Sequence, residues 1–205
     1  MPIVNARMYS VTAEAKADWH RVLGWALRRA GLDWEIVDFD APAPLAQLWA
    51  RADLPGAKVV VSDDWESCVR GADIVVEASR LEKPEPKLKT EWIEKGACVI
   101  PYGTMSAVEL SLIDIMDKIV MDDWGQARSG PYGALRAHVD SGRLSEKNLH
   151  AELGQIVAGL KPGRESDGET NLFWHRGLSL SDIALGAAML AKARRLGIGQ
   201  RLRFR

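Results

Sequence analysis

His175 is the side chain in this sequence that is best suited to proton transfer. An imidazole titrates near neutral pH, so it can take up or release a proton under physiological conditions. The residue follows a short apolar run at positions 171–174 and precedes an apolar helical pattern, which predicts a strand-to-helix turn. His175 is therefore a candidate general acid or base. The alternative is a turn histidine that donates to a backbone carbonyl and takes no part in chemistry.

Two hydroxyl residues, Ser10 and Thr12, lie between the first expected strand and a long expected helix. The amides in the first turn of a helix have no partner within it, and together with the hydroxyls they can bind a phosphate. The alternative is that Thr12 only caps the helix, since threonine is favoured at that position. The pair predicts either a phosphate contact or a plain helix start.

Charged residues stand at the ends of two further expected strands. Asp38 and Asp40 close the second strand, where a carboxylate accepts from a ribose hydroxyl and favours NAD over NADP. Two carboxylates in an ordinary turn are the alternative. Ser79 and Arg80 follow the strand expected at residues 72–78, where they can contact a phosphate or a substrate carboxylate. An exposed arginine without a ligand explains the same sequence.

No metal site is predicted. Asp122 and Asp123 are adjacent carboxylates, which hard divalent cations prefer as ligands. No third ligand lies nearby in the sequence, so a strand-end pair that caps the next helix is the favoured interpretation. His20, His138 and His150 are expected on polar helix faces, in contact with solvent.

Strands and helices alternate at short spacing along the chain. Strands are predicted at residues 3–9, 34–39, 58–61, 72–78, 97–100, 118–121 and 171–174. Helices are predicted at residues 12–30, 45–51, 65–70, 108–116, 126–138 and 149–160, with a last helix capped by Ser179 or Ser181. This alternation predicts an α/β fold with a doubly wound, mainly parallel sheet in a Rossmann-like three-layer architecture. In such a sheet, ligands bind outside the carboxyl ends of the strands.

The composition is that of a folded domain without a strong charge. The chain has 205 residues, of which 47% are hydrophobic, and its formal net charge is −1. It can bury one core, so residues 1–205 are expected to form a single α/β domain, with neither nucleic acid nor a membrane as partner. Cys68 and Cys98 are expected to be thiols of a reducing compartment, with a disulfide as the alternative. The sequence shows no signal peptide and no long apolar span, so a cytoplasmic protein is expected.

A set of short motifs recurs in a fixed order in the second half of the chain. They are Ala151-Glu152-Leu153-Gly154, Lys161-Pro162-Gly163-Arg164, Thr170 with Leu172-Phe173, and Gly177-Leu178 with Asp182-Ile183-Ala184. In this order the motifs resemble the carboxy-terminal part of the ornithine cyclodeaminase and mu-crystallin family. Weaker matches upstream extend the resemblance over residues 57–196.

The resemblance implies a bound NAD or NADP, and a small amino or imino acid as the substrate. Ser79, Gly103 and Thr104 match loops that line the cofactor in the family. Residues 55–205 then form the family-like part, including its C-terminal helices. A homo-oligomer is expected, because the absence of the family's substrate domain leaves apolar surface uncovered.

Three features of the family are not matched. No G-x-G-x-x-G lies between the first strand and the first helix, and the G-x-G at Gly197 belongs to an expected C-terminal loop. The loop at residues 101–109 has no aspartate at the family's catalytic position, and the amino-terminal domain with the substrate-binding arginine and lysine has no counterpart. Enzyme activity is left open, and a non-catalytic remnant of a Rossmann-like fold is an alternative function.

The first segment of the chain differs from the rest. Residues 1–54 are predicted to form an atypical first β-α-β segment, and residues 5–54 are similar to the start of phosphate/phosphonate-type solute-binding proteins. The similarity lies in Met8-Tyr9-Ser10-Val11-Thr12 and Ala41-Pro42-Ala43-Pro44-Leu45. Two families would then join near Pro55-Gly56. This second resemblance implies a small-anion (phosphate or phosphonate) binding domain as another alternative.

Overall fold

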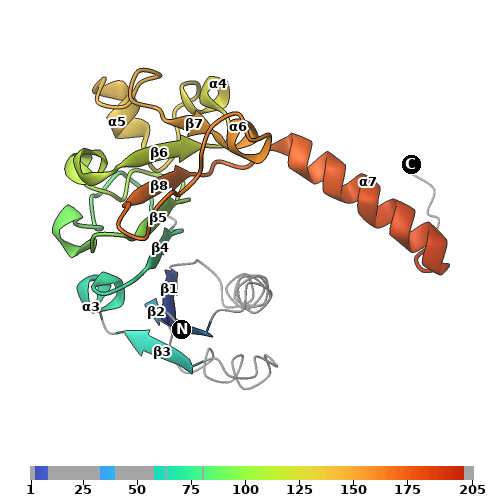
Figure 1. Ribbon diagram of the computed structural model, residues 1–205, viewed down its shortest axis with the longest axis horizontal. Coiled ribbons are helices and arrows are strands. Elements are labelled where there is room, and N and C mark those ends of the chain that lie inside the picture. Colours follow the sequence, from blue (N-terminus) through green and yellow to red (C-terminus); the bar gives the residue numbers. More distant parts are fainter. Residues whose placement is uncertain (1–2, 9–32, 40–57, 63, 80, 201–205) are drawn as a thin grey trace. The chain divides into compact units, whose positions relative to one another are not determined.

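The computed structural model describes residues 3–8, 33–39, 58–62, 64–79 and 81–200, with side chains from residue 62 onward (Figure 1). The chain divides into two compact units, residues 1–175 and residues 176–205. The first unit holds the sheet and the short helices, and the second holds the C-terminal helix. The helices expected at residues 12–30 and 45–51 lie outside the described residues.

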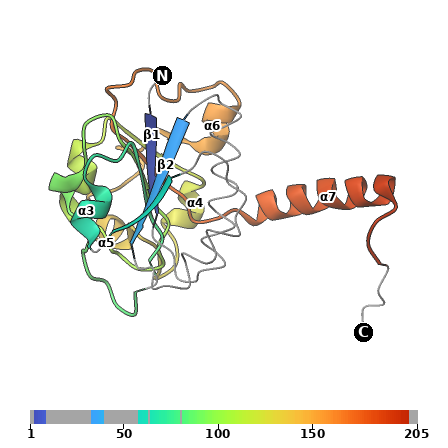
Figure 2. The ribbon, with the colours of Figure 1, turned by 90° about the horizontal axis from the view of Figure 1, so that it is seen from below.

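Parallel strands form one eight-stranded sheet in the order β3-β2-β1-β4-β5-β8-β6-β7. Their bounds are β1 Ile3–Met8, β2 Asp33–Phe39, β3 Lys58–Ser62, β4 Ile74–Glu77, β5 Cys98–Pro101, β6 Lys118–Met121, β7 Ala151–Glu152 and β8 Asn171–Trp174. β1 has β2 on one side, as Figure 2 shows, and β4 on the other, so the winding reverses between β1 and β4. The doubly wound parallel sheet is confirmed, and β7 is a strand that the sequence pattern did not predict.

A row of apolar side chains crosses the middle of the sheet. The register pairs Val75 of β4 with Val99 of β5, Val99 with Leu172 of β8, and Leu172 with Ile119 of β6. Val75, Val99 and Leu172 are fully buried, and Ile119 is nearly so. Because paired residues of neighbouring strands point to the same face, this row forms one layer of the core. The layer holds the four strands at a common level.

The helices that the structure describes in the first unit are short. They are α3 Trp65–Val69, α4 Trp124–Ala127, α5 Arg136–Asp140 and α6 Leu153–Val157, with the 3₁₀ helices η1 Thr90–Trp92 and η2 Leu110–Ile115. α3 confirms the helix expected at residues 65–70, whereas the helix expected at residues 108–116 is a 3₁₀ helix. Asp64 caps α3 by accepting a hydrogen bond from the amide of Ser67 at 2.7 Å. Cys68 in α3 and Cys98 in β5 are free thiols, as expected.

The helix expected at residues 126–138 does not form as one element. α4 ends at Ala127 and α5 begins at Arg136, with a loop between them. Gly130 and Gly133 in this loop have φ values of 81° and 132°, and Pro131 lies between them. Positive φ angles and a proline both interrupt the hydrogen-bond ladder of an α-helix. The apolar spacing across this segment therefore did not reflect a continuous helix.

The helix expected at residues 149–160 is wrong in part. The amide of His150 donates to the carbonyl of Ile119 at 2.8 Å, and β7 then pairs with β6. This pairing keeps the chain extended, so α6 begins only at Leu153. Val157 on its apolar stripe is 80% exposed, so the stripe does not form a core face.

α7 Ser179–Leu196 makes up most of the second unit. It begins after Leu178 with no side-chain hydrogen bond at its start, so the expected capping by Ser179 or Ser181 is wrong. The helix ends at Gly197, whose φ of 66° is left-handed, which confirms that the G-x-G lies beyond the helix. In the part of the chain that the structure describes, no helix is long and apolar enough to cross a bilayer.

Replacing Leu172 by alanine removes the centre of the apolar row. We expect the free energy of unfolding to fall by about 2–5 kcal/mol, because a fully buried leucine leaves a cavity that closes only in part. Urea unfolding followed by tryptophan fluorescence measures the loss. Val157→Ala, at an exposed position, is the matched control and should change stability by less than about 0.5 kcal/mol. Equal losses in both variants would contradict the position of this core layer.

Candidate functional site

Polar side chains gather at the carboxyl ends of the neighbouring strands β4, β5, β8 and β6. In a parallel sheet these ends share one edge, so residues that are far apart in the sequence meet there. Each residue of the group is the last of its strand or follows it closely. The residues that contact one another at this edge, here named the carboxyl-edge cluster, are Glu77, Ser79, Tyr102, Gly103, Asp122 and His175.

The strand register brings Asp122 and His175 together. Met121 of β6 pairs with Trp174 of β8, so the next residues of the two strands stand at the same level. Nδ1 of His175 lies 3.1 Å from Oδ2 of Asp122, and the two side chains are 32% and 1% exposed. The contact lacks the alignment of a hydrogen bond, so it is an electrostatic pair that becomes an ion pair when the imidazole is protonated.

Aromatic rings hold the imidazole of His175. The ring of Tyr102 stacks on it with a centroid distance of 5.3 Å and an interplanar angle of 15°. The ring of Phe173 stacks with a centroid distance of 5.7 Å and an angle of 24°. Stacking favours one orientation of the imidazole. With Asp122 beside Nδ1, the other nitrogen, Nε2, lies on the far side of the ring from the carboxylate. The arrangement can therefore offer one ring nitrogen for proton exchange.

Glu77 carries a carboxyl group that has no solvent contact. Its exposure is 0%, and burial raises its pKa because the charged form loses its hydration. Oε1 accepts hydrogen bonds from the hydroxyl of Ser79 and from its amide, the latter at 2.8 Å. Oε2 accepts from the amide of Gly103 at 3.3 Å, and these hydrogen bonds offset part of the rise in pKa. Glu77 thereby connects the loops after β4 and β5.

Two of the residues expected to line a cofactor donate hydrogen bonds to the same side chain. Ser79 and Gly103 meet at the carboxyl group of Glu77. Thr104, next to Gly103, is exposed, and its carbonyl accepts from the amide of Gly133 at 3.0 Å. Hydrogen bonds to Glu77 therefore join the ends of β4 and β5.

Most of the site residues expected near the first two strands lie outside the described residues. Asp38 lies inside β2, where its backbone pairs with Met8 of β1 and Val61 of β3, and the strand continues to Phe39. Four other expected site residues lie outside the described residues, together with His20: they are Ser10, Thr12, Asp40 and Arg80.

Asp122 and Asp123 have separate roles. The carboxylate of Asp123 caps α4 by accepting from the amide of Gln126 at 2.5 Å, which confirms the capping interpretation for this residue. Asp122 is buried beside His175 instead. Among the described residues, no group of three or more His, Cys, Asp or Glu side chains is placed to hold a metal ion.

The predicted solvent exposure of His138 is wrong, whereas His150 keeps part of its exposure. His138 is fully buried in α5, with Nε2 3.0 Å from the carbonyl oxygen of Glu109, and burial lowers its pKa. His150 is partly buried, with Nε2 2.9 Å from the carbonyl oxygen of Pro162. Neither histidine lies in the continuous helix to which it was assigned, because α4 ends at Ala127 and α6 begins at Leu153.

Sequence reasoning missed Glu77 and the pairing of Asp122 with His175. For Glu77 a signal was present, since it is the one charged residue in the otherwise apolar run at residues 74–78, close to the edge where ligands bind. For the pair there was none, because only the register between β6 and β8 shows that the two residues are neighbours.

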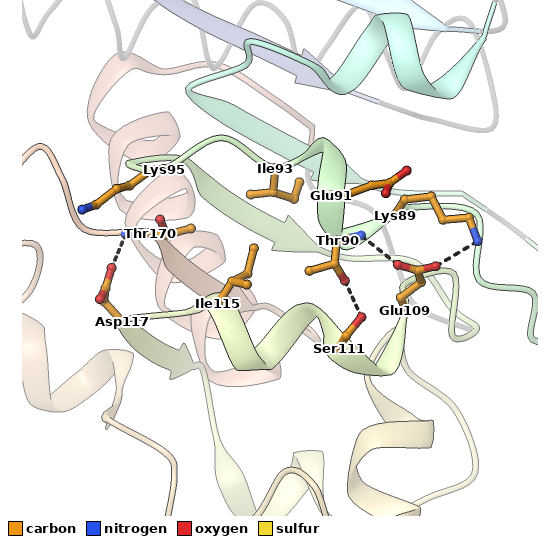
Figure 3. Close-up of a pocket in the computed structure, with 10 residues that line it drawn as sticks. All are labelled: Lys89, Thr90, Glu91, Ile93, Lys95, Glu109, Ser111, Ile115, Asp117 and Thr170. Carbon is orange, nitrogen blue, oxygen red and sulfur yellow. Dashed lines mark hydrogen bonds and ion pairs between the residues drawn. The ribbon is translucent and has the colours of Figure 1, made fainter.

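A groove of about 820 Å³ lies at the opposite, amino-terminal edge of the sheet (Figure 3). Several of its polar groups form hydrogen bonds with one another. Glu109 accepts from Nζ of Lys89 and from the amide of Thr90, both at 2.9 Å, and Asp117 accepts from the amide of Thr170 at 2.7 Å. These contacts join η1 to η2 and fix the approach to β8. The polar residues of the groove therefore have a structural role in joining these loops.

The profile of the ornithine cyclodeaminase/mu-crystallin family matches this sequence over residues 41–195. This span is most of the chain, so the protein belongs to the ornithine cyclodeaminase/mu-crystallin family. The match begins well before residue 57 and takes in the end of the segment at residues 5–54. This overlap leaves the resemblance to solute-binding proteins without support.

Relatives with assigned activities match part of their length. An alanine dehydrogenase of Archaeoglobus fulgidus is 33% identical over 135 residues, which are 64% of this chain and 41% of the relative. A Delta(1)-pyrroline-2-carboxylate reductase of Bacillus cereus is 30% identical over 153 residues, which are 73% of this chain and 46% of the relative. The chain thus spans less than half the length of these relatives.

Solved structures share the fold. An archaeal alanine dehydrogenase dimer with bound NAD has a TM-score of 0.78 at 24% identity, covering 98% of this chain and 61% of that one. The Delta(1)-pyrroline-2-carboxylate reductase of Thermococcus litoralis, in complex with NADH and L-proline, has a TM-score of 0.76 at 22% identity, covering 97% of this chain and 61% of that one. These likenesses confirm the Rossmann-like fold.

The buried carboxyl group of Glu77 makes stability depend on pH. Burial raises its folded pKa above the ordinary 4.5, so the stability it contributes is complete below pH 4.5 and is lost as the pH rises through the folded pKa. Glu77→Gln has no such loss. We therefore expect the stability of the variant, relative to the wild type, to increase as the pH rises above 4.5, as measured by urea unfolding at each pH. Stability curves that run parallel over this range would contradict the raised pKa.

Proposed function

We propose that this chain provides the NAD- or NADP-binding part of an oxidoreductase that acts on a small amino or imino acid. Its support is the family membership, together with relatives named as an alanine dehydrogenase and a pyrroline-2-carboxylate reductase. Solved structures of the same fold hold NAD or NADH. One observation carries the proposal: an imidazole paired with a buried carboxylate stands at the sheet edge where nucleotide cofactors bind.

The residues at this edge suit a dinucleotide. Ser79 and Thr104 offer hydroxyl groups, and Gly103 offers a backbone without a side chain. A Cβ atom at Gly103 would lie 2.5 Å from Oε2 of Glu77, so the loop requires glycine to keep its place. We assign Ser79, Gly103 and Thr104 to the cofactor. The proposal assigns the ribose hydroxyls to Asp38 and Asp40, and the phosphates to Ser10, Thr12 and Arg80.

His175 is the proposed proton-transfer residue. The cofactor, when bound, supplies hydride transfer to or from the α-carbon of the substrate. His175 exchanges a proton with the substrate nitrogen through Nε2, acting as an acid when an imine is reduced and as a base in the reverse direction. Asp122 attracts the positive charge of the protonated ring, and Tyr102 with Phe173 holds its orientation.

We further propose a homo-oligomer that covers α7. Leu180, Ile183 and Met189 on this helix are 73%, 69% and 62% exposed. Exposed apolar surface costs roughly 25 cal/mol per Å² in water, so a helix with these side chains gains stability when an interface covers it. The solved archaeal alanine dehydrogenase is a dimer.

Titration of the purified chain with NADH and NADPH tests the cofactor proposal. We expect a saturable change in tryptophan fluorescence and a rise in Tm, since a ligand at 100 times its Kd stabilises the folded state by about 2.7 kcal/mol. A variant with Asp38→Ala and Asp40→Ala should bind NADH more weakly. Binding of inorganic phosphate without binding of NADH would instead support the small-anion alternative. Binding of neither would leave a non-catalytic domain.

Replacing His175 by glutamine tests the proton-transfer role. Turnover is measured with NAD and a panel of small amino acids, and with NADH and the corresponding imino acids. We expect kcat to fall by about 10²–10⁴-fold, because this is the usual contribution of a positioned acid or base, while the Kd for NADH stays within about twofold. His150→Gln, outside the carboxyl-edge cluster, should leave kcat unchanged. Full turnover in His175→Gln would remove His175 from the mechanism.

A further inference from the structure

Glu77 connects two loops through both its side chain and its backbone. Its carboxyl group accepts from Ser79 and Gly103, as described above. Its carbonyl oxygen also accepts from the amides of Tyr102 and Gly103, at 2.6 Å and 3.0 Å. The loop after β5 is therefore bound to one residue of β4 by three hydrogen bonds. The loop after β4 returns to the same residue through Ser79.

These contacts extend from Glu77 to the proposed proton-transfer residue. Gly103 is adjacent to Tyr102, and the ring of Tyr102 stacks on the imidazole of His175. The carboxylate of Asp122 lies beside Nδ1 of the same imidazole. A displacement of the loop after β5 would therefore move one of the surfaces that orient His175.

The energetics of Glu77 argue against a simple contribution to stability. A carboxylate that is removed from water loses a large hydration energy, and neutral donors such as amides and a hydroxyl return only part of it. Among the described residues, no charged partner is recorded for this carboxyl group, and its pKa is raised mainly by burial. Gln at the same position would fill the same volume without burying a carboxylate, but it would lose one of the two acceptor oxygens. What the carboxyl group adds is two acceptor oxygens that hold two loops in a fixed relation.

We propose that Glu77 is a positioning residue, which sets the loops after β4 and β5 so that Ser79 and Gly103 can hold the cofactor and Tyr102 can orient His175. The inference rests on the proposed function, and it assigns a role to a residue that does not itself contact substrate or cofactor. It also accounts for Gly103, because any side chain there would collide with the carboxyl group of Glu77.

Two variants separate the contributions of the two oxygens. Glu77→Ala removes both acceptors and should free both loops. Glu77→Gln keeps an oxygen that can accept from Ser79, but places an amide NH₂ opposite the amide of Gly103, where two donors repel each other. Glu77→Gln should therefore loosen the loop after β5 more than the loop after β4.

Thr170→Ala is the matched control. Thr170 is also a buried polar residue, and its hydroxyl accepts from the amide of Gly96 at 3.0 Å. It ties a loop at the amino-terminal edge of the same sheet, away from the carboxyl-edge cluster. A general effect of losing one buried polar group should appear in this variant as well, whereas a positioning effect should not.

Hydrogen exchange of the whole chain without cofactor measures the first consequence. We expect faster exchange at Ser79 and at residues 102–104 in Glu77→Ala, faster exchange mainly at residues 102–104 in Glu77→Gln, and wild-type exchange at both loops in Thr170→Ala. Unchanged exchange at these loops in a folded Glu77→Ala would overturn the inference. If Glu77→Ala does not fold, the Glu77→Gln variant, which keeps the side-chain volume, decides in the same way.

The Kd for NADH, measured by fluorescence titration below the unfolding transition, tests the second consequence. It should rise on the order of tenfold in Glu77→Ala and less in Glu77→Gln, and stay at the wild-type value in Thr170→Ala. Wild-type affinity in a Glu77 variant whose loops exchange faster would overturn the link to the cofactor. A wild-type chain that binds neither NADH nor NADPH would instead refute the proposed function, and the exchange data would still decide whether Glu77 holds the loops.

Discussion

The hydrogen-bond register between β4, β5, β8 and β6 is the constraint on which the rest of the structure depends. Because side chains alternate between the faces of a sheet, a slip of one residue would turn the apolar row at Leu172 away from the core. Burial of this row therefore fixes the register. The same register sets which residues follow each strand at the same level, so Asp122 meets His175 as a consequence of core packing. The hydrophobic layer of the sheet therefore determines where the residues of the candidate site lie.

The carboxyl-edge cluster contains two buried carboxyl groups with different partners. Asp122 lies beside an imidazole, which can carry a compensating positive charge. Among the described residues, Glu77 accepts hydrogen bonds from neutral donors, and burial raises its pKa. A carboxylate beside a titratable base suits proton transfer, whereas one that collects backbone amides suits the placement of loops. The two groups therefore support different proposed roles, proton transfer for the pair of Asp122 with His175 and loop placement for Glu77.

Family membership is shown for most of this chain, and the chain spans only part of the length of its relatives. The fold of the solved structures matches nearly the whole of this chain. The sequence match to the alanine dehydrogenase and the pyrroline-2-carboxylate reductase covers less than half of each relative. The described residues supply the sheet edge, its loops and a candidate acid or base. The apolar side chains of α7 are exposed to water, and the proposed oligomer would bury them in an interface.

The sequence by itself determined the strands β4, β5, β6 and β8, because short apolar runs are a local property. Its motifs identified the family, and its residue types proposed Ser79, Gly103 and His175 as site residues. It could not give the order β5-β8-β6, in which the last strand inserts between two earlier ones. It also misplaced the helices at residues 126–138 and 149–160, since apolar spacing does not report left-handed glycines or pairing with a distant strand. Only the tertiary structure placed Asp122 against His175 and removed Glu77 from water. The physical reason is that register and burial exist only once distant strands have packed, and the chemistry of a carboxyl group depends on both.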